Sequence, residues 1–109
     1  MAYDEQLAER IRETLEGRDG LTERKMFGGI GFMLHGNMCC GVSKDELILR
    51  LGPAQGPRAL TEPHTRAFGM SGRPMTGMVM VGPRGYATEE ALSRWLGQAV
   101  GFTSSLPPK

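Results

Sequence analysis

Two short runs of β-forming residues, joined by a two-residue loop, are the feature that most constrains the fold of this chain. Residues 30–34 alternate apolar side chains with other residues, residues 38–42 resume the β-forming run, and Gly36-Asn37 lies between them. Glycine and asparagine tolerate the positive φ angles that a tight hairpin turn requires. The segment is therefore predicted to be an antiparallel hairpin, and mirror pairing about the turn predicts that Met33 lies opposite Cys40.

The segments around this hairpin predict further strands between two good helices. Leu7, Ile11 and Leu15 recur every four residues, which predicts a helix over 4–16 with Asp4 as its N-cap. Other elements are predicted as strands over 22–27, 46–51, 65–70 and 78–81, a short helix over 53–60, and a helix after Thr88 that buries Leu92, Trp95, Leu96 and Ala99. Short connections exclude parallel crossovers. The order predicts a two-layer α+β class, in which helices pack on one face of an antiparallel sheet.

The length of 109 residues suits one small domain. Glycine and proline make up about a fifth of the chain without a fixed repeat, as expected for short elements joined by turns. We predict a single domain over 1–109 with a frayed tail at 104–109. No apolar run approaches 18 residues, and the first five residues include two acidic side chains and no basic one, so a cytoplasmic protein without a membrane partner is expected.

The net charge of +1 hides an uneven distribution along the chain. Residues 1–23 carry seven acidic and three basic side chains, whereas residues 24–87 carry eight basic and three acidic ones. This basic middle segment either forms solvated surface that is partly ion-paired or faces an acidic partner. Direct nucleic-acid binding is expected to be weak, because both predicted helices carry abundant acids and neither resembles a recognition helix.

Cys39 and Cys40 are adjacent, so a disulfide between them would be strained, because neighbouring Cα atoms lie only about 3.8 Å apart. In a regular strand their side chains would point to opposite faces and could not easily reach one metal ion. We therefore expect two structural thiols, at least one of them packed in the core.

No catalytic constellation emerges from the sequence. Gly28 to Gly31 leads from one predicted strand into another rather than into a helix, so a phosphate-binding loop is not expected. His35 and His64 lie far apart in sequence, and a dyad of His35 with Cys40 conflicts with a register that sets His35 opposite Met38. We predict that the protein is not an enzyme and has no cofactor.

Eight methionines are many for a chain of this length. They either fill an irregular, glycine-rich core or line an adaptable binding surface. A soft-metal site is a further alternative, because Met38 and Cys40 would share a face with Met33 across the hairpin.

Several motifs together resemble the N-terminal domain of the TfoX/Sxy family. The motifs are Arg24-Lys25-Met26-Phe27-Gly28-Gly29-Ile30-Gly31-Phe32-Met33, then Gly36-Asn37-Met38, Cys40-Gly41-Val42, Leu49-Arg50, Gly72-Arg73-Pro74-Met75 and Gly77-Met78-Val79. The resemblance runs from about residue 3 to the tail. It implies a two-layer α+β fold similar to that of type III secretion chaperones.

Full-length members of this family are bacterial regulators of natural competence that act with a cyclic-AMP receptor protein. The resemblance therefore implies an interaction module and supplies no catalytic residues. Their separate C-terminal helical domain has no room in 109 residues.

The function predicted from the sequence is a non-enzymatic protein-interaction or regulatory domain. Its partner is expected to be another protein, with the transcription machinery as one candidate, and a homodimer is compatible with the sequence. The candidate interaction surface comprises Arg24, Lys25, Arg50 and Arg73. Strand alternation predicts that Arg24 and Arg50 point away from the face that the leucines bury. A weak nucleic-acid-binding protein and a small-ligand or soft-metal-binding domain remain the alternatives.

Overall fold

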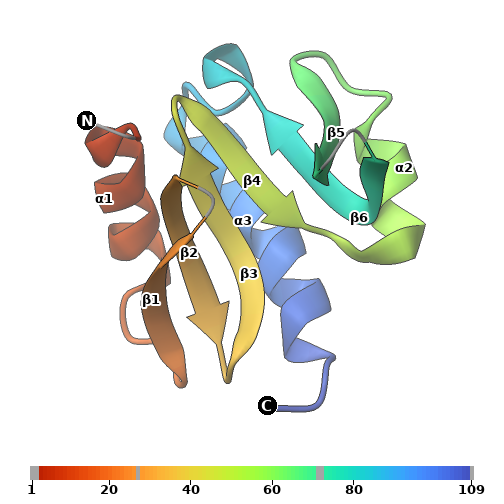
Figure 1. Cartoon of the computed structure of the whole chain (residues 1–109). Coiled ribbons are helices and arrows are strands. Elements are labelled where there is room, and N and C mark those ends of the chain that lie inside the picture. The colour runs from red at the N-terminus through yellow and green to blue at the C-terminus, as the bar shows by residue number, and fades with distance from the viewer. Residues whose placement is uncertain (1–2, 27, 71–72, 109) are drawn as a thin grey trace.

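One antiparallel sheet runs through the molecule, and its helices lie on one side of it (Figure 1). The computed structural model of the protein describes residues 3–26, 28–70 and 73–108, without the side chains of residues 69, 70 and 73–76. The elements in chain order are α1 (Glu5–Leu15), β1 (Leu21–Met26), β2 (Gly29–Leu34), β3 (Asn37–Ser43), β4 (Glu46–Arg50), α2 (Gly52–Ala59), β5 (Thr65–Met70), β6 (Arg73–Val81), the 3-10 turn η1 (Pro83–Gly85) and α3 (Glu89–Ser104).

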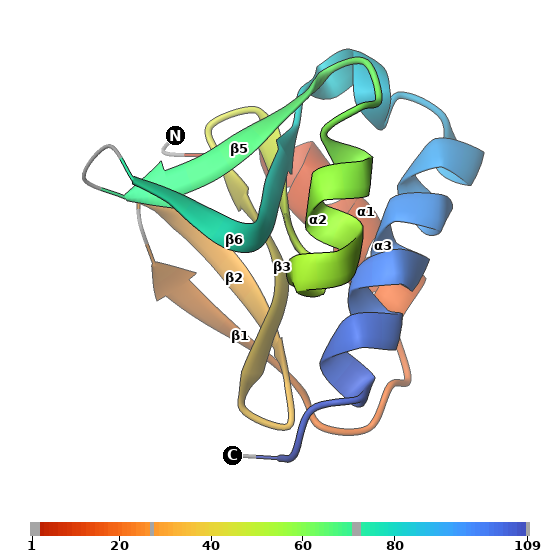
Figure 2. The ribbon, with the colours of Figure 1, turned by 90° about the vertical axis from the view of Figure 1, so that its right-hand side faces the viewer.

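The six strands lie in the order β1-β2-β3-β4-β6-β5, and all neighbours are antiparallel. The predicted α+β class and the predicted order of elements are confirmed. One strand is longer than predicted, because β6 begins at Arg73 rather than near Met78 and pairs with β5 in a hairpin. In Figure 2 the β5–β6 hairpin bends away from the helices, so this edge of the sheet projects on the side opposite them.

The two long helices begin at side-chain caps, as the sequence predicts. The Asp4 carboxylate accepts hydrogen bonds from the backbone N–H groups of Gln6 and Leu7, and the Thr88 hydroxyl accepts one from Ala91. These bonds satisfy N–H groups that have no partner within the helix. None of the three α-helices in the described part of the chain has the length and apolar character needed to cross a membrane.

The described apolar side chains form two clusters, one on each side of the sheet. The main core lies between the sheet and the helices, and its members that lose all or nearly all exposure include Phe32, Leu47, Leu49 and Trp95. The second cluster lies on the other side and consists of Ile48, Phe68, Met78 and Met80, with Met38 against it. Strand alternation explains the division, because Ile48 stands between two leucines that face the helices.

The predicted register of the β2–β3 hairpin is wrong. The turn residues are His35 and Gly36, with φ angles of 51° and 84°, rather than Gly36 and Asn37. Positive φ at both central residues is the signature of a tight hairpin turn whose twist matches that of the strands. Met33 therefore lies opposite Met38, and not opposite Cys40; His35 has no strand partner.

The prediction that Cys39 and Cys40 point to opposite faces is also wrong. Phe32 pairs with Cys40 while Met33 pairs with Met38, so Cys39 is an extra residue on β3, a β-bulge. A bulge interrupts side-chain alternation, and both cysteines consequently lie in the main core without exposed area. Met38 lies against the second cluster instead, so Met38 and Cys40 do not share a face, contrary to the basis of the soft-metal alternative.

Asn37 is the first residue of β3 rather than a turn residue, and its side chain binds the C-terminal segment. Its side chain is buried, and its Nδ2 donates a hydrogen bond of 2.8 Å to the Pro107 carbonyl oxygen. Pro107, in the segment 104–109 that we predicted to fray, is thus held against the start of β3.

Candidate interaction surface

In the described part of the chain, no helix lies on the side of the sheet opposite α1 and α3 (Figure 2). Strand register identifies its residues, because directly paired residues on neighbouring strands face the same side. Arg24 pairs with Gly31, Gly31 with Gly41, and Gly41 with Ile48, which belongs to the second cluster. We call this side of β1–β4 the helix-free face; its described members include Arg24, Met26, Gly31, Met33, Met38, Gly41 and Ile48.

Methionine side chains lie on the helix-free face, and one of them covers a glycine. Met33 and Met38 lie directly opposite one another and are both half-buried. Met26 is also half-buried and lies over Gly31, since a Cβ atom added at Gly31 would come within 2.8 Å of the Met26 sulfur. Gly31 is therefore the residue that gives the Met26 side chain its place on the sheet. Met26, Met33 and Met38 therefore form an apolar surface of adaptable side chains on this face.

Arg24 places an unpaired positive charge beside these methionines, among the described residues. Arg24 on β1 is exposed and takes part in no ion pair among the described residues. Its neighbour Lys25 is also exposed but lies on the opposite side of the strand, because it pairs with Ile30, a member of the main core. The sequence-based surface is therefore divided between the two sides of the sheet.

The other basic residues at this side of the sheet have different surroundings. Arg66 forms an ion pair with Glu46 across β6, and hydrogen bonding from its guanidinium, together with its charge, holds the pKa of the Glu46 carboxyl below its ordinary value. The Arg50 guanidinium carbon lies 5.8 Å from the centroid of the Phe102 ring on α3, a cation–π contact that turns it toward the helical layer. Arg24 and Arg50 are thus not brought together. Arg73 opens β6, and its side chain lies outside the described residues.

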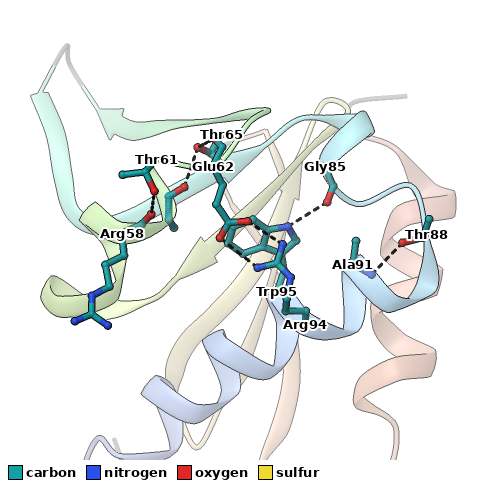
Figure 3. A network of polar contacts seen from close by, with 10 residues as sticks. Arg58, Thr61, Glu62, Thr65, Gly85, Thr88, Ala91, Arg94 and Trp95 are labelled. Carbon is teal, nitrogen blue, oxygen red and sulfur yellow. Dashed lines mark hydrogen bonds and ion pairs between the residues drawn. The ribbon is translucent and has the colours of Figure 1, made fainter.

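A second group of polar contacts, between α2 and α3, is structural. Figure 3 shows Glu62 accepting two hydrogen bonds, of 3.0 and 3.2 Å, from the Arg94 guanidinium, which also stacks 4.4 Å from the Trp95 ring centroid. Trp95 in turn donates from Nε1 to the Gly85 carbonyl oxygen at 3.1 Å. These contacts join the segment after α2 to α3.

Two cavities of about 380 Å³ open on the helical side of the molecule. One lies between the start of α2 and the end of α3 and is lined largely by apolar atoms, including those of Leu51 and Phe102. The other lies between the α1–β1 loop, the β2–β3 turn and the end of α3, and its polar lining includes Arg18 and His35. Within the described residues, no group of three or more His, Cys, Asp or Glu side chains is placed to hold a metal ion.

Sequence reasoning missed the second apolar cluster and the role of the methionines in it. The sequence contained evidence for this cluster, because residues two positions apart in a strand face the same side. Met78 and Met80 are spaced in this way, as are Ile48 and Arg50. The sequence did not reveal that the β5–β6 hairpin extends the helix-free side of the sheet and contributes Phe68, Met78 and Met80 to the second cluster.

These features define a small α+β domain in which one side of an antiparallel sheet holds the helices and the other side carries methionine and arginine. The family model of the TfoX N-terminal domain matches residues 13–103, most of the chain. The protein therefore belongs to the TfoX N-terminal domain family, which is associated with competence regulation. Comparisons with curated proteins and with solved structures find no significant match.

Proposed function

We propose that this protein is a non-enzymatic, regulatory interaction domain that binds a partner protein on its helix-free face. The observation that carries the proposal is the position of the exposed, unpaired Arg24 beside three half-buried methionines on a sheet side that no helix covers. Components of the transcription machinery are the partner class we would test first, in keeping with the association of the family with competence regulation.

The chemistry of this face favours a protein partner. Methionine side chains are unbranched and polarisable, so they adapt to an apolar surface of another molecule, and arginine and methionine are both enriched in protein interfaces. A partner with a carboxylate beside an apolar side chain would satisfy Arg24 and cover Met26 and Met33 together. Binding would also dehydrate the guanidinium, which strengthens its attraction to an acid.

A nucleic-acid partner has less support. Arg12, Arg66 and Arg94 are each paired with a glutamate, and the first turns of α1 and α3 carry acidic residues. Phosphate binding needs several unpaired cations close together, and neutralised arginines do not provide them.

The test is affinity capture from a lysate of the source cells, with and without nuclease, using the wild-type domain and two variants. Arg24→Glu reverses the charge on the helix-free face, whereas Lys25→Glu makes the same reversal one residue away on the opposite side of β1. Both side chains are exposed and unpaired among the described residues, so neither change should move the melting temperature by more than about 2 °C, which corresponds to roughly 0.5 kcal/mol or less.

We expect nuclease-resistant capture of a specific protein by the wild-type domain and by Lys25→Glu, and its loss with Arg24→Glu. Loss of all capture on nuclease treatment would support the nucleic-acid alternative. Equal capture by Arg24→Glu and by the wild-type domain would show that the partner binds elsewhere.

A further inference from the structure

The polar cavity on the helical side is formed by three segments that are distant in sequence. Its volume is about 380 Å³, and its walls are the α1–β1 loop, the β2–β3 turn and the end of α3. This volume lies within the range of small-molecule sites, about 300–1,000 Å³, and is far larger than the roughly 30 Å³ of one water molecule. The residues that line it are Gly17, Arg18, Asp19, Leu34, His35 and Ser104.

Hydrogen bonds between these segments fix the walls of the cavity. The backbone N–H group of His35 donates to the Gly20 carbonyl oxygen at 3.0 Å, which joins the β2–β3 turn to the α1–β1 loop. The Asn37 side chain donates to the Pro107 carbonyl oxygen, which joins the start of β3 to the segment after α3. The fold therefore sets the shape of the cavity before a ligand binds, and little ordering of the chain remains to oppose binding.

The backbone at two positions directs the His35 imidazole to this place. His35 has a φ angle of 51°, in the left-handed region that few side chains other than asparagine adopt. Its ring lies against the backbone of Gly20, because a Cβ atom added at Gly20 would collide with the imidazole. Backbone conformations of this kind persist where neighbouring contacts hold them, and they cluster at ligand sites.

The polar side chains of the lining are free to bind a ligand. Within the described residues, Arg18, Asp19, His35 and Ser104 form no ion pair and no side-chain hydrogen bond, and all four are exposed. Four arginines elsewhere in the described part of the chain are, by contrast, paired with glutamate. The cavity thus gathers hydrogen-bonding groups that the fold itself does not use.

These groups determine the chemistry of the ligand. Arg18 carries a permanent positive charge and a planar set of donors that matches phosphate oxygens, and His35 and Ser104 add further donors. Three donor groups suit the three terminal oxygens of a phosphate monoester better than the two of a carboxylate. The Asp19 carboxylate only accepts hydrogen bonds, so it repels a bare anion and favours hydroxyl groups beside the phosphate.

We propose that this cavity binds a small phosphorylated polyol. The phosphate lies against Arg18, His35 and Ser104, and the hydroxyl groups of the polyol donate to Asp19. The site is on the helical side of the sheet, so this binding does not depend on the partner that we propose for the helix-free face.

The test is isothermal titration calorimetry of the full-length chain with glycerol 3-phosphate and with glucose 6-phosphate. Inorganic phosphate, glycerol and glucose are the control ligands. At least one phosphorylated probe should bind with 1:1 stoichiometry and about tenfold or more tightly than each control, because only the probes engage both halves of the site. Equal affinity for inorganic phosphate would overturn the assignment of a polyol, and no binding of either probe would overturn the proposal.

Variants of the phosphate-binding half locate the bound probe. Arg18→Gln removes the cation, and His35→Asn removes the imidazole while keeping a residue that accepts positive φ. Each should weaken binding of the probe about tenfold or more. Arg84→Gln makes the same charge change at an exposed position in the η1 turn and should bind as the wild type does. Wild-type affinity in both Arg18→Gln and His35→Asn would contradict the site.

Asp19→Asn should affect the two kinds of ligand in opposite directions. The change removes the repulsion of an anion, so inorganic phosphate should bind more tightly. It also removes the charged acceptor for hydroxyl groups, so the phosphorylated probe should lose its advantage over inorganic phosphate. An unchanged ratio of the two affinities would contradict the role of Asp19 in selecting a polyol.

Discussion

The contact between α2 and β6 leads to a prediction in which two similar substitutions have opposite effects. A Cβ atom added at Gly56 on α2 would lie 2.7 Å from the Gly77 Cα atom of β6, closer than such atoms approach in real proteins. Because the obstacle is backbone rather than the end of a flexible side chain, α2 must move away from the sheet. Gly56→Ala should therefore destabilise the fold.

Gly97→Ala supplies the matched control. Gly97 is an exposed position within α3, and a Cβ atom added there would meet nothing within 4 Å. Alanine is favoured over glycine in a helix interior by about 0.5–1 kcal/mol, so Gly97→Ala should stabilise the protein by roughly that amount. The same propensity gain partly offsets the clash at Gly56. The difference between the two variants thus approximates the cost of overpacking, about 1–3 kcal/mol.

Urea unfolding and thermal melting followed by circular dichroism measure this difference. For a domain of about this size, 1 kcal/mol corresponds to about 4–8 °C in melting temperature, so the two variants should be clearly separated. Equal melting temperatures for Gly56→Ala and Gly97→Ala would refute the glycine–glycine contact between α2 and β6.

Two further predictions concern polar groups in the fold. Burial raises the pKa of Tyr86 to about 12, so the native state retains its proton more strongly than the unfolded chain, and stability should fall as the pH rises from about 10 to 12. Tyr86→Phe should flatten that decline in a series of urea titrations, while losing about 1 kcal/mol at neutral pH with the 2.6 Å hydrogen bond to the Asp45 carbonyl oxygen. Asn37→Ala should remove the bond to Pro107, lower stability by about 1 kcal/mol, and speed proteolysis of the tail; an unchanged proteolysis rate would contradict the anchoring role.

Periodicity predicted most of the fold because each element shows its pattern within a few residues. The spacing of Leu7, Ile11 and Leu15 defines α1, and their exposed fractions are 1% or less. Strand alternation likewise predicted that Ile48 would face away from Leu47 and Leu49, which is confirmed. These inferences depend on local sequence and on the burial of one side, which a single sequence contains.

Register could not be predicted, because it depends on which residues accept positive φ and on where the strand admits an extra residue. Glycine and asparagine accept positive φ more readily than most residues, so Gly36 and Asn37 were predicted as the turn. In the structure His35 occupies the first turn position, at φ 51°. The turn shifted by one residue, and the bulge at Cys39 then shifted the rest of β3 by another. The bulge is the change that places Cys40 beside Cys39 in the main core, and it thereby removes Cys40 from the side of Met38.

The candidate surface was only partly predictable for a related reason. Alternation correctly separates the side of Arg24 from that of Lys25, since β1 is regular. Arg50 has the same alternation but stands at the end of β4, where its long side chain reaches Phe102 on α3. Sequence patterns within β4 contain no information about which helix ends beside it.

The central claim is that the partner binds the helix-free face, and methionine methyl groups report on it directly. With methyl-labelled methionines, addition of the captured partner should shift and broaden the NMR signals of Met26, Met33 and Met38, and Arg24→Glu should abolish these changes at the same partner concentration. A partner that binds the wild-type domain while all three signals stay in place would contradict the account.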